Sequence, residues 1–256
     1  MALNLDPAWL WPLLAAPAVG SFLGVLVARL PRGEAISWTR SACRHCRQQL
    51  AIRDLIPIIS WAVQKGRCRH CGAALGWFYP GIELLAVAVV LWAAAALPRD
   101  LIWPACLLGW WLIALGWIDA REMVLPDVLT LPLVVAGLAV TGLIPPDRLA
   151  HHVAGALAGF AAIALVGFAY RRVRGRDGIG MGDAKLAAAA GAWVAWTGLP
   201  GVILIAALSG IAVTLLAALV AGRVGGDRAL TAKLPFGPHL ALGTWIIWVH
   251  GPLVVP

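Results

Sequence analysis

The chain has 256 residues, of which 61% are hydrophobic and only 12% are charged. A soluble domain carries about 25% charged residues, so this composition excludes a soluble globular protein. The formal net charge of +8 would indicate nucleic acid or acidic partners in a soluble protein. In a membrane protein it reports topology instead, because Lys and Arg collect on the cytoplasmic side. We therefore expect an all-α polytopic membrane protein.

Eight apolar stretches have about the 20-residue length that a membrane-spanning helix needs. We expect the first to be a span rather than a cleavable signal peptide, because it lacks a basic N-terminal region. The fourth contains Pro126, Asp127 and Pro132 and should begin irregularly. The stretches are residues 9–30, 80–97, 101–118, 123–144, 151–170, 183–198, 200–221 and 235–255.

Basic residues orient these spans. Eight spans place both termini on one side of the membrane. If the termini are outside, all of the 20 Lys and Arg residues except Arg99 and Arg148 lie inside, as the positive-inside rule requires. We expect a first span (residues 1–30), a small cytoplasmic domain (31–79) and a seven-span membrane domain (80–256).

Two C-x-x-C pairs lie in the cytoplasmic domain, Cys43 with Cys46 and Cys68 with Cys71. Pairs at about this spacing place four thiolates around Zn²⁺, and a metal would help a domain with few apolar residues to fold. The cytoplasmic placement argues against structural disulfides. We expect structural zinc, with redox pairing as the alternative. Cys106 lies alone in an apolar span and should only pack.

The Arg residues near the cysteines also occur in nucleic-acid-binding modules. Here membrane topology already accounts for them, and few aromatic residues alternate with them. We therefore expect the lipid bilayer as a partner, with anionic lipids attracting the basic side chains, and no nucleic acid.

Aspartates lie at the ends of two spans, where an ionisable group is costly and indicates a function. Asp119 ends the third span, and Asp183 begins the sixth within Gly180-Met-Gly182-Asp183. Both lie at the cytoplasmic boundary of this topology and can meet. Of two neighbouring carboxyls, one can take a proton from water while the other donates to a carbonyl oxygen, as in aspartic proteases. The glycines would let an extended substrate approach.

Other interpretations of these residues stay open. Asp183 can cap its helix, Asp119 can pair with Arg121, and both can serve a proton-coupled transporter. Asp127 can support the site or cap the fourth helix, and Lys185 can anchor its helix at the head groups. A zinc-dependent adaptor, in which the aspartates are dispensable, is a further alternative.

Ordered motifs along nearly the whole chain resemble the prepilin peptidases, also called type IV leader peptidases, a family of membrane aspartyl proteases. The two C-x-x-C pairs resemble the zinc domain of that family. The other matching strings are residues 20–31, 56–61, 79–84, 119 with 125–132, 180–186 and 235–238.

The resemblance implies that Asp119 and Asp183 are the catalytic pair. It implies a bacterial inner-membrane enzyme with periplasmic termini and a cytoplasmic active site. Such an enzyme cleaves the leader of type IV prepilins or type II secretion pseudopilins, just before the hydrophobic helix. It then N-methylates the new N-terminal residue with S-adenosylmethionine, whose site no motif locates. A peptidase that lacks methyl transfer is the alternative. Residues that would contact substrate or support the site are Gly180, Gly182, Asp127, Glu83 and Lys185.

Overall fold

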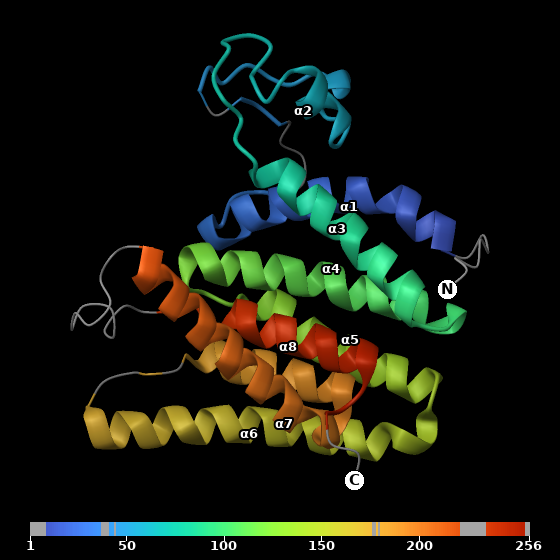
Figure 1. The fold of residues 1–256 in the computed structure, drawn as a ribbon, viewed down its shortest axis with the longest axis vertical. Coiled ribbons are helices and arrows are strands. Elements are labelled where there is room, and N and C mark those ends of the chain that lie inside the picture. Colours follow the sequence, from blue (N-terminus) through green and yellow to red (C-terminus); the bar gives the residue numbers. More distant parts are fainter. Residues whose placement is uncertain are drawn as a thin grey trace. The chain divides into compact units, whose positions relative to one another are not determined.

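The computed structural model describes residues 9–36, 41–43, 45–175, 178, 180–220 and 234–253, and they are almost entirely helical (Figure 1). This part of the chain contains no strand and only two isolated antiparallel bridges, Ala42 with Gln49 and Arg67 with Ala74. The longer helices are α1 (Leu10–Arg29), α3 (Phe78–Ala96), α4 (Arg99–Glu122), α5 (Asp127–Leu143), α6 (Leu149–Arg174), α7 (Met181–Val220) and α8 (Gly237–His250), and short elements are η2 (Leu30–Arg32), η3 (Ile52–Asp54), α2 (Ile59–Val63) and η4 (Pro146–Arg148).

Within the described ranges, five helical stretches are long and apolar enough to cross a membrane, which confirms the prediction of an all-α polytopic membrane protein. They are Leu10–Arg32, Phe78–Ala96, Arg99–Glu122, Pro146–Arg174 and Met181–Val220. Helix α7 consists of two segments that meet at Ala195, where φ is 58° and ψ is 178°. Each predicted span overlaps a helix or one segment of α7, but the number of eight spans is not confirmed. Residues 221–233 and both termini, on which the predicted orientation depends, lie outside the described residues.

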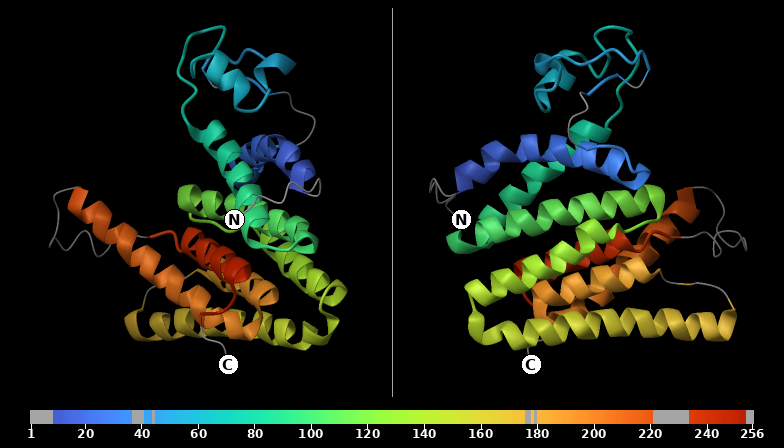
Figure 2. Two further views of the ribbon diagram at one scale, coloured as in Figure 1. Left: turned by 45° about the vertical axis from the view of Figure 1, so that its right-hand side comes forward. Right: turned by 180° about the vertical axis from the view of Figure 1, so that it is seen from behind.

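The chain divides into two compact units, Met1–Ala114 and Leu115–Pro256, so α4 begins in one unit and ends in the other. In the first unit α1 packs against α3, as both views of Figure 2 show. Gly20 permits this approach, because a Cβ there would lie 2.5 Å from Cα of Glu83. The indole of Trp110 donates to the carbonyl oxygen of Ala86 at 3.0 Å and joins α4 to α3.

In the second unit α7 contacts α5, α6 and α8. Helices α6 and α7 approach closely because a Gly155-x-x-x-Gly159 motif of α6 meets Ala187 and Gly191 of α7. A Cβ at Gly159 would collide with the carbonyl oxygen of Ala187, and one at Gly191 with that of Gly155. Small residues at this spacing let helices pack in lipid, where no hydrophobic force drives their association.

The end of α4 meets the start of α8, since a Cβ at Gly116 would lie 3.4 Å from Cα of Pro238. The start of α7 likewise meets the segment before α5, since a Cβ at Gly182 would lie 3.0 Å from Cβ of Leu125. The ends of four helices of the second unit therefore come together in one place.

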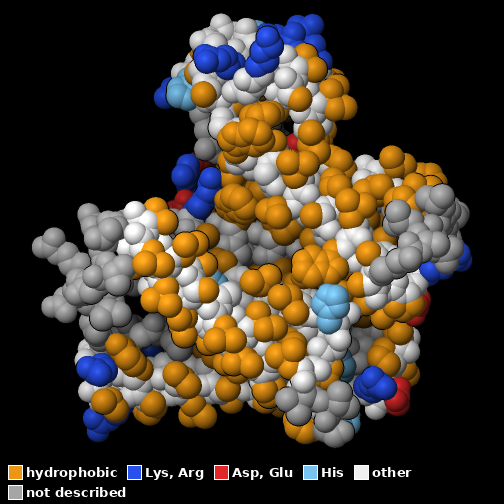
Figure 3. Space-filling view, in the orientation of Figure 1, with side chains coloured by type: hydrophobic (Ala, Val, Ile, Leu, Met, Phe, Trp, Pro, Cys, Tyr) orange, Lys and Arg blue, Asp and Glu red, His pale blue; other side chains and the backbone are white. Residues whose placement is uncertain are grey.

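The surface differs between the helices and the cysteine domain, which we define as described residues 41–43 and 45–77. Hydrophobic side chains cover much of the helical face in Figure 3, whereas Lys and Arg gather on the cysteine domain. Exposed apolar side chains over long helices are expected where lipid is the solvent.

Candidate active site and metal centre

A pocket of about 330 Å³ in the second unit is lined by both aspartates that the sequence predicts as a catalytic pair. Asp119 lies in the last turn of α4, and Asp183 lies in the first turn of α7. The two carboxyl-bearing side chains therefore line the same cavity, although they lie on different helices. The other lining residues are Met123, Val124, Leu125, Asp127, Gly180, Met181, Gly182 and Lys185.

Asp119 is buried, with 6% of its surface exposed. Its Oδ2 accepts a hydrogen bond of 2.8 Å from the backbone amide of Gly237, the first residue of α8. The positive end of the α8 dipole therefore faces this carboxyl group. His239, also buried, interacts electrostatically with Asp119, and its Nδ1 is 3.0 Å from the hydroxyl oxygen of Ser209.

Asp183 is partly exposed and is held by residues of its own turn. Its Oδ2 accepts a hydrogen bond of 3.2 Å from the amide of Gly180, and its own amide donates to the carbonyl oxygen of Gly180 at 3.1 Å. It is the third residue of α7, which begins at Met181, so Asp183 is not the N-cap residue, but its carboxyl group caps the amide of the residue just before the helix. Gly180 itself is exposed.

Two of the residues that line the pocket form an ion pair. Nζ of Lys185 lies 2.6 Å from Oδ1 and 2.7 Å from Oδ2 of Asp127. Asp127 makes no side-chain cap at the start of α5, where Pro126 is the N-cap residue. Of the two alternatives for Asp127, the helix cap is thus not formed, and an ion pair joins α5 to α7. Lys185 binds this partner, and its anchoring at the head groups stays a prediction.

Glu83 belongs to the first unit and has a structural partner there. Its side chain is buried, with 4% of the residue exposed, and Oε2 accepts a hydrogen bond of 2.7 Å from the amide of Ile58. Ile58 has a φ of 61° at the start of α2, a conformation that non-glycine residues seldom adopt. Glu83 therefore attaches α3 to a strained turn of the cysteine domain.

The four cysteines of the two C-x-x-C pairs come together. Their Sγ atoms all lie within 4.8 Å of one another, and Sγ of Cys43 is 3.9 Å from Sγ of Cys71. Tetrahedral zinc with Zn–S bonds of about 2.3 Å separates its sulfurs by about 3.8 Å, so the donor set fits. All five cysteines of the chain are free thiols.

The backbone favours the thiolate form of the first cysteine in each hairpin. In each hairpin the backbone amide of the first cysteine donates a hydrogen bond across the turn. Cys43 donates to the carbonyl oxygen of Gln48 at 2.9 Å, and Cys68 donates to that of Ala73 at 2.8 Å. Hydrogen bonds from backbone amides, that of Cys46 having the largest effect and that of His45 the next largest, lower the pKa of the Cys43 thiol to about 6. A thiolate is the metal-binding form of cysteine, so the hairpin favours binding of a metal ion.

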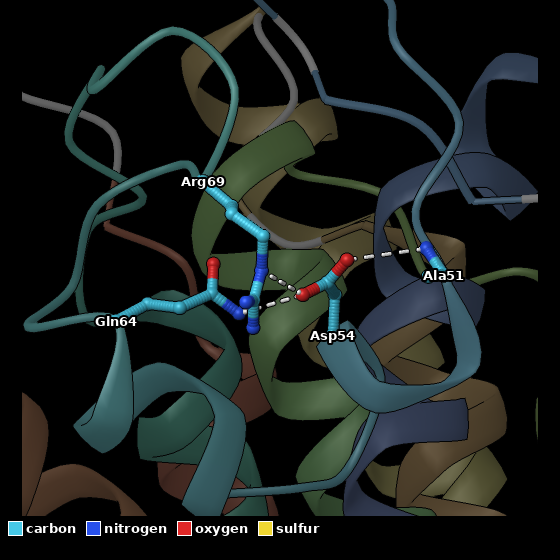
Figure 4. Close-up of polar contacts among 4 residues, drawn as sticks. All are labelled: Ala51, Asp54, Gln64 and Arg69. Atoms are coloured by element: carbon cyan, nitrogen blue, oxygen red, sulfur yellow. Dashed lines mark hydrogen bonds and ion pairs between the residues drawn. The ribbon is translucent and has the colours of Figure 1, made fainter.

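Asp54 links the two halves of the cysteine domain (Figure 4). Its Oδ1 accepts hydrogen bonds from Nε of Arg69 at 2.9 Å and from the side-chain Nε2 of Gln64 at 3.2 Å. Its Oδ2 accepts a hydrogen bond from the backbone amide of Ala51 at 3.2 Å. Desolvation acts to raise the pKa of Asp54, but the hydrogen bonds from Arg69 and Ala51 and the charges of Arg69 and Arg53 together outweigh it and lower that pKa. The second cysteine hairpin, which contains Arg69, is thus tied to η3.

Two residues of the site were not predicted. Gly237 lies in the string 235–238, whose resemblance gave no role for the glycine, and His239 follows two residues later. The signal for Gly237 was the string itself, which places a glycine at the start of an apolar helix. The residues around His239 give no comparable signal.

Comparison with known proteins places the chain in a family. Residues 14–97 match the bacterial peptidase A24 N-terminal domain, and residues 106–215 match the type IV leader peptidase family. A protein of Dickeya chrysanthemi named prepilin leader peptidase/N-methyltransferase is 38% identical over 90% of this chain and 88% of its own length. Two further proteins with the same name are also similar. The one from Pectobacterium carotovorum subsp. carotovorum is 37% identical over 94% of this chain and 93% of its own length. The one from Aeromonas hydrophila is 35% identical over 91% of this chain and 87% of its own length. No solved structure matches the chain. The chain therefore belongs to the type IV leader peptidase family.

Proposed function

We propose that this protein is a membrane aspartyl endopeptidase that cleaves the leader of type IV prepilins or type II secretion pseudopilins at the cytoplasmic face. We propose also that it N-methylates the new N-terminal residue, with S-adenosylmethionine as methyl donor. The names of the relatives support both activities. The observation that carries the peptidase is the placement of the Asp119 and Asp183 carboxyl groups in one pocket.

The contacts of the pocket fit this chemistry. One aspartate, as the carboxylate, takes a proton from a water molecule whose oxygen attacks the scissile carbonyl carbon. The other, protonated, donates to the carbonyl oxygen, and the tetrahedral intermediate collapses when the departing amine receives a proton. The amides of Gly237 and Gly180 each hold one carboxyl oxygen, which leaves the other oxygen of each group for water and substrate.

Zinc has a separate role in this proposal. Cys43, Cys46, Cys68 and Cys71 would hold the ion, and four thiolates leave no open position for substrate. The ion would therefore stabilise the cysteine domain and take no part in hydrolysis. The basic residues of this domain support its placement at the cytoplasmic face.

The test is cleavage of a full-length prepilin in detergent by the wild type, Asp119→Asn and Asp183→Asn. Asparagine keeps the size of the side chain and removes its titratable proton. We expect both variants to retain their thermal unfolding profile and zinc content and to lose cleavage by at least about a thousandfold, the scale on which essential catalytic groups act.

Mass spectrometry of the product separates the two activities. A cleaved product that carries a methyl group when S-adenosylmethionine is present supports both. A cleaved product that carries no methyl group under the same conditions supports the peptidase activity and contradicts the methyltransferase activity. If either asparagine variant cleaves at the wild-type rate, the proposed catalytic pair is wrong.

A further inference from the structure

Helix α8 packs along the segment of α7 that follows Ala195, as the views of Figure 2 show. A Cβ at Gly243 would lie 2.5 Å from the carbonyl oxygen of Val202, and one at Gly201 would lie 2.7 Å from Cδ1 of Ile247. Small residues bring the two helices together in this way. A hydrogen bond between side chains is directional, so it can also fix where one helix begins along the other.

The first turn of α8 carries a polar side chain that contacts α7. Nδ1 of His239 lies 3.0 Å from the hydroxyl oxygen of Ser209. The imidazole ring also lies against Gly210, since a Cβ there would be 3.6 Å from Cδ2 of His239. His239 is buried, with 8% of its surface exposed, so water has little access to this bond. The contact joins α8 to α7 at the end of α8 that begins beside Asp119.

The partners of Ser209 assign the proton of this bond. A hydroxyl group has one proton to donate and two lone pairs with which to accept. The hydroxyl of Ser209 donates to the carbonyl oxygen of Ala206 at 3.2 Å, so its oxygen accepts from His239. Nδ1 of His239 therefore carries the proton. Because the imidazolium form carries this proton as well, the bond persists whether or not Nε2 is protonated.

The same turn of α8 holds the amide that binds a carboxyl group of the pocket. Gly237 precedes His239 by two residues, and its amide donates to Oδ2 of Asp119 at 2.8 Å. The amide of His239 donates to the carbonyl oxygen of Phe236 at 3.1 Å, which closes the turn that contains Gly237. A shift of this turn along α7 would therefore move the Gly237 amide away from Asp119.

We propose that His239 is a positioning residue of the peptidase. Its hydrogen bond to Ser209 holds the first turn of α8 in the place where the amide of Gly237 orients Asp119. The inference rests on the proposed function, in which Asp119 is one of the two catalytic groups. His239 acts through the Gly237 amide and takes no part in the proton transfers of the reaction.

The test compares three substitutions of His239 in cleavage of a full-length prepilin in detergent. The amide nitrogen of asparagine lies as many bonds from Cα as Nδ1 of histidine, whereas that of glutamine corresponds to Nε2. His239→Asn can therefore keep the bond to Ser209 and should retain kcat within about threefold of the wild type. His239→Gln and His239→Leu should lower kcat by about tenfold to a hundredfold, the scale on which misplaced catalytic groups lose rate, with little change in KM.

Substitution of the acceptor gives an independent measurement. Ser209→Ala should lower kcat about tenfold. Thr214→Val is the matched control, because the hydroxyl of Thr214 donates within α7 to the carbonyl oxygen of Gly210 at 2.8 Å, and it should cleave at the wild-type rate. In the Gly237→Ala variant, where Asp119 is already displaced, addition of His239→Leu should cost less than about twofold, since the two residues act as a unit.

Several outcomes would overturn the positioning role while leaving the peptidase intact. One is a wild-type kcat in His239→Leu or in Ser209→Ala. Another is faster cleavage by His239→Gln than by His239→Asn, because Nε2 would then be the atom that matters. A third is an undiminished effect of His239→Leu in the Gly237→Ala background. If leucine prevents folding, the comparison of asparagine with glutamine still decides. If the wild type cleaves no prepilin, the proposed function falls, and the positioning role falls with it.

Discussion

The backbone amide of Gly237 donates to Oδ2 of Asp119 at 2.8 Å, although the two residues are 118 positions apart in the sequence. This bond brings the start of α8 to the end of α4. It also fixes the orientation of one carboxyl group, so that the pocket does not depend on a freely rotating side chain.

Gly237→Ala should therefore impair catalysis more than folding. A Cβ at this position would lie 2.7 Å from Oδ2 and 3.0 Å from Cβ of Asp119, so the carboxyl group must move. Displacement by about 1 Å costs about a hundredfold in rate for a positioned catalytic group. We expect that loss in kcat for prepilin cleavage, with a similar thermal unfolding midpoint.

Gly142→Ala is the control, because a Cβ at Gly142 would meet only one side-chain atom, at 4.0 Å. It should cleave at the wild-type rate. Wild-type kcat in Gly237→Ala would show that the orientation of Asp119 does not limit the reaction.

The ion pair of Asp127 with Lys185 should support the pocket without taking part in the chemistry. Lys185→Gln or Asp127→Asn should lower kcat/KM by less than about tenfold and stability by about 0–1 kcal/mol, since the pair is partly exposed, with side chains 28% and 56% accessible. The double variant should be no worse than either single variant, because the interaction is already lost. A thousandfold loss in one single variant would make that residue catalytic.

The elements that could be predicted from sequence are those with a local signal. Apolar length located the helices, and the C-x-x-C spacing located the four-thiol cluster. The pocket of Asp119 and Asp183 could be anticipated because the expected membrane topology places both residues at one boundary. Contacts between distant segments could not be anticipated from the sequence. Lys185 binds Asp127, which lies 58 positions earlier in the chain, and this pairing depends on how α5 packs against α7. The two segments of α7 correspond to the spans expected at residues 183–198 and 200–221, but the exact position of the break at Ala195 lacks a sequence signal, because alanine favours helix.

Removal of the proposed zinc ion should affect the cysteine domain before the membrane helices. Cys46→Ser should lose bound zinc, of which we expect about one ion per wild-type chain, and make residues 41–77 sensitive to protease. The membrane helices should keep their helical circular dichroism. Cys106→Ala is the control and should retain zinc, because Cys106 lies in α4 and outside the cluster. Full zinc content in Cys46→Ser would contradict the four-cysteine site.

Glu83 should act through its hydrogen bond to Ile58. Glu83→Gln keeps an acceptor oxygen and should leave the protease resistance of the cysteine domain near that of the wild type. Glu83→Ala leaves the Ile58 amide without its partner, at a cost of about 1–3 kcal/mol, and should raise the rate of proteolysis between residues 52 and 77. If Glu83→Gln abolishes methylation or cleavage while proteolysis is unchanged, Glu83 contacts the reaction instead.

Asp54 should stabilise the cysteine domain in a manner that depends on pH. Because Arg69 lowers the pKa of Asp54 in the folded state, its contribution is fully present above the unfolded pKa of about 3.9 and is lost as pH falls through the lower folded value. Asp54→Asn should thus open the domain to protease more readily than the wild type. The difference should be constant from about pH 5 to pH 8 and shrink only below about pH 4.

The control for Asp54 is Glu34→Gln, which removes an exposed carboxyl group outside the cysteine domain and should leave proteolysis unchanged at every pH. The pH at which the difference in proteolysis between wild type and Asp54→Asn disappears identifies the group that causes this difference. If the difference between wild type and Asp54→Asn disappears near pH 6, a group that titrates in that range, such as a cysteine thiol, controls the domain. A constant difference down to about pH 4 instead requires a carboxylate held ionised by a cation, which is the arrangement of Asp54 and Arg69.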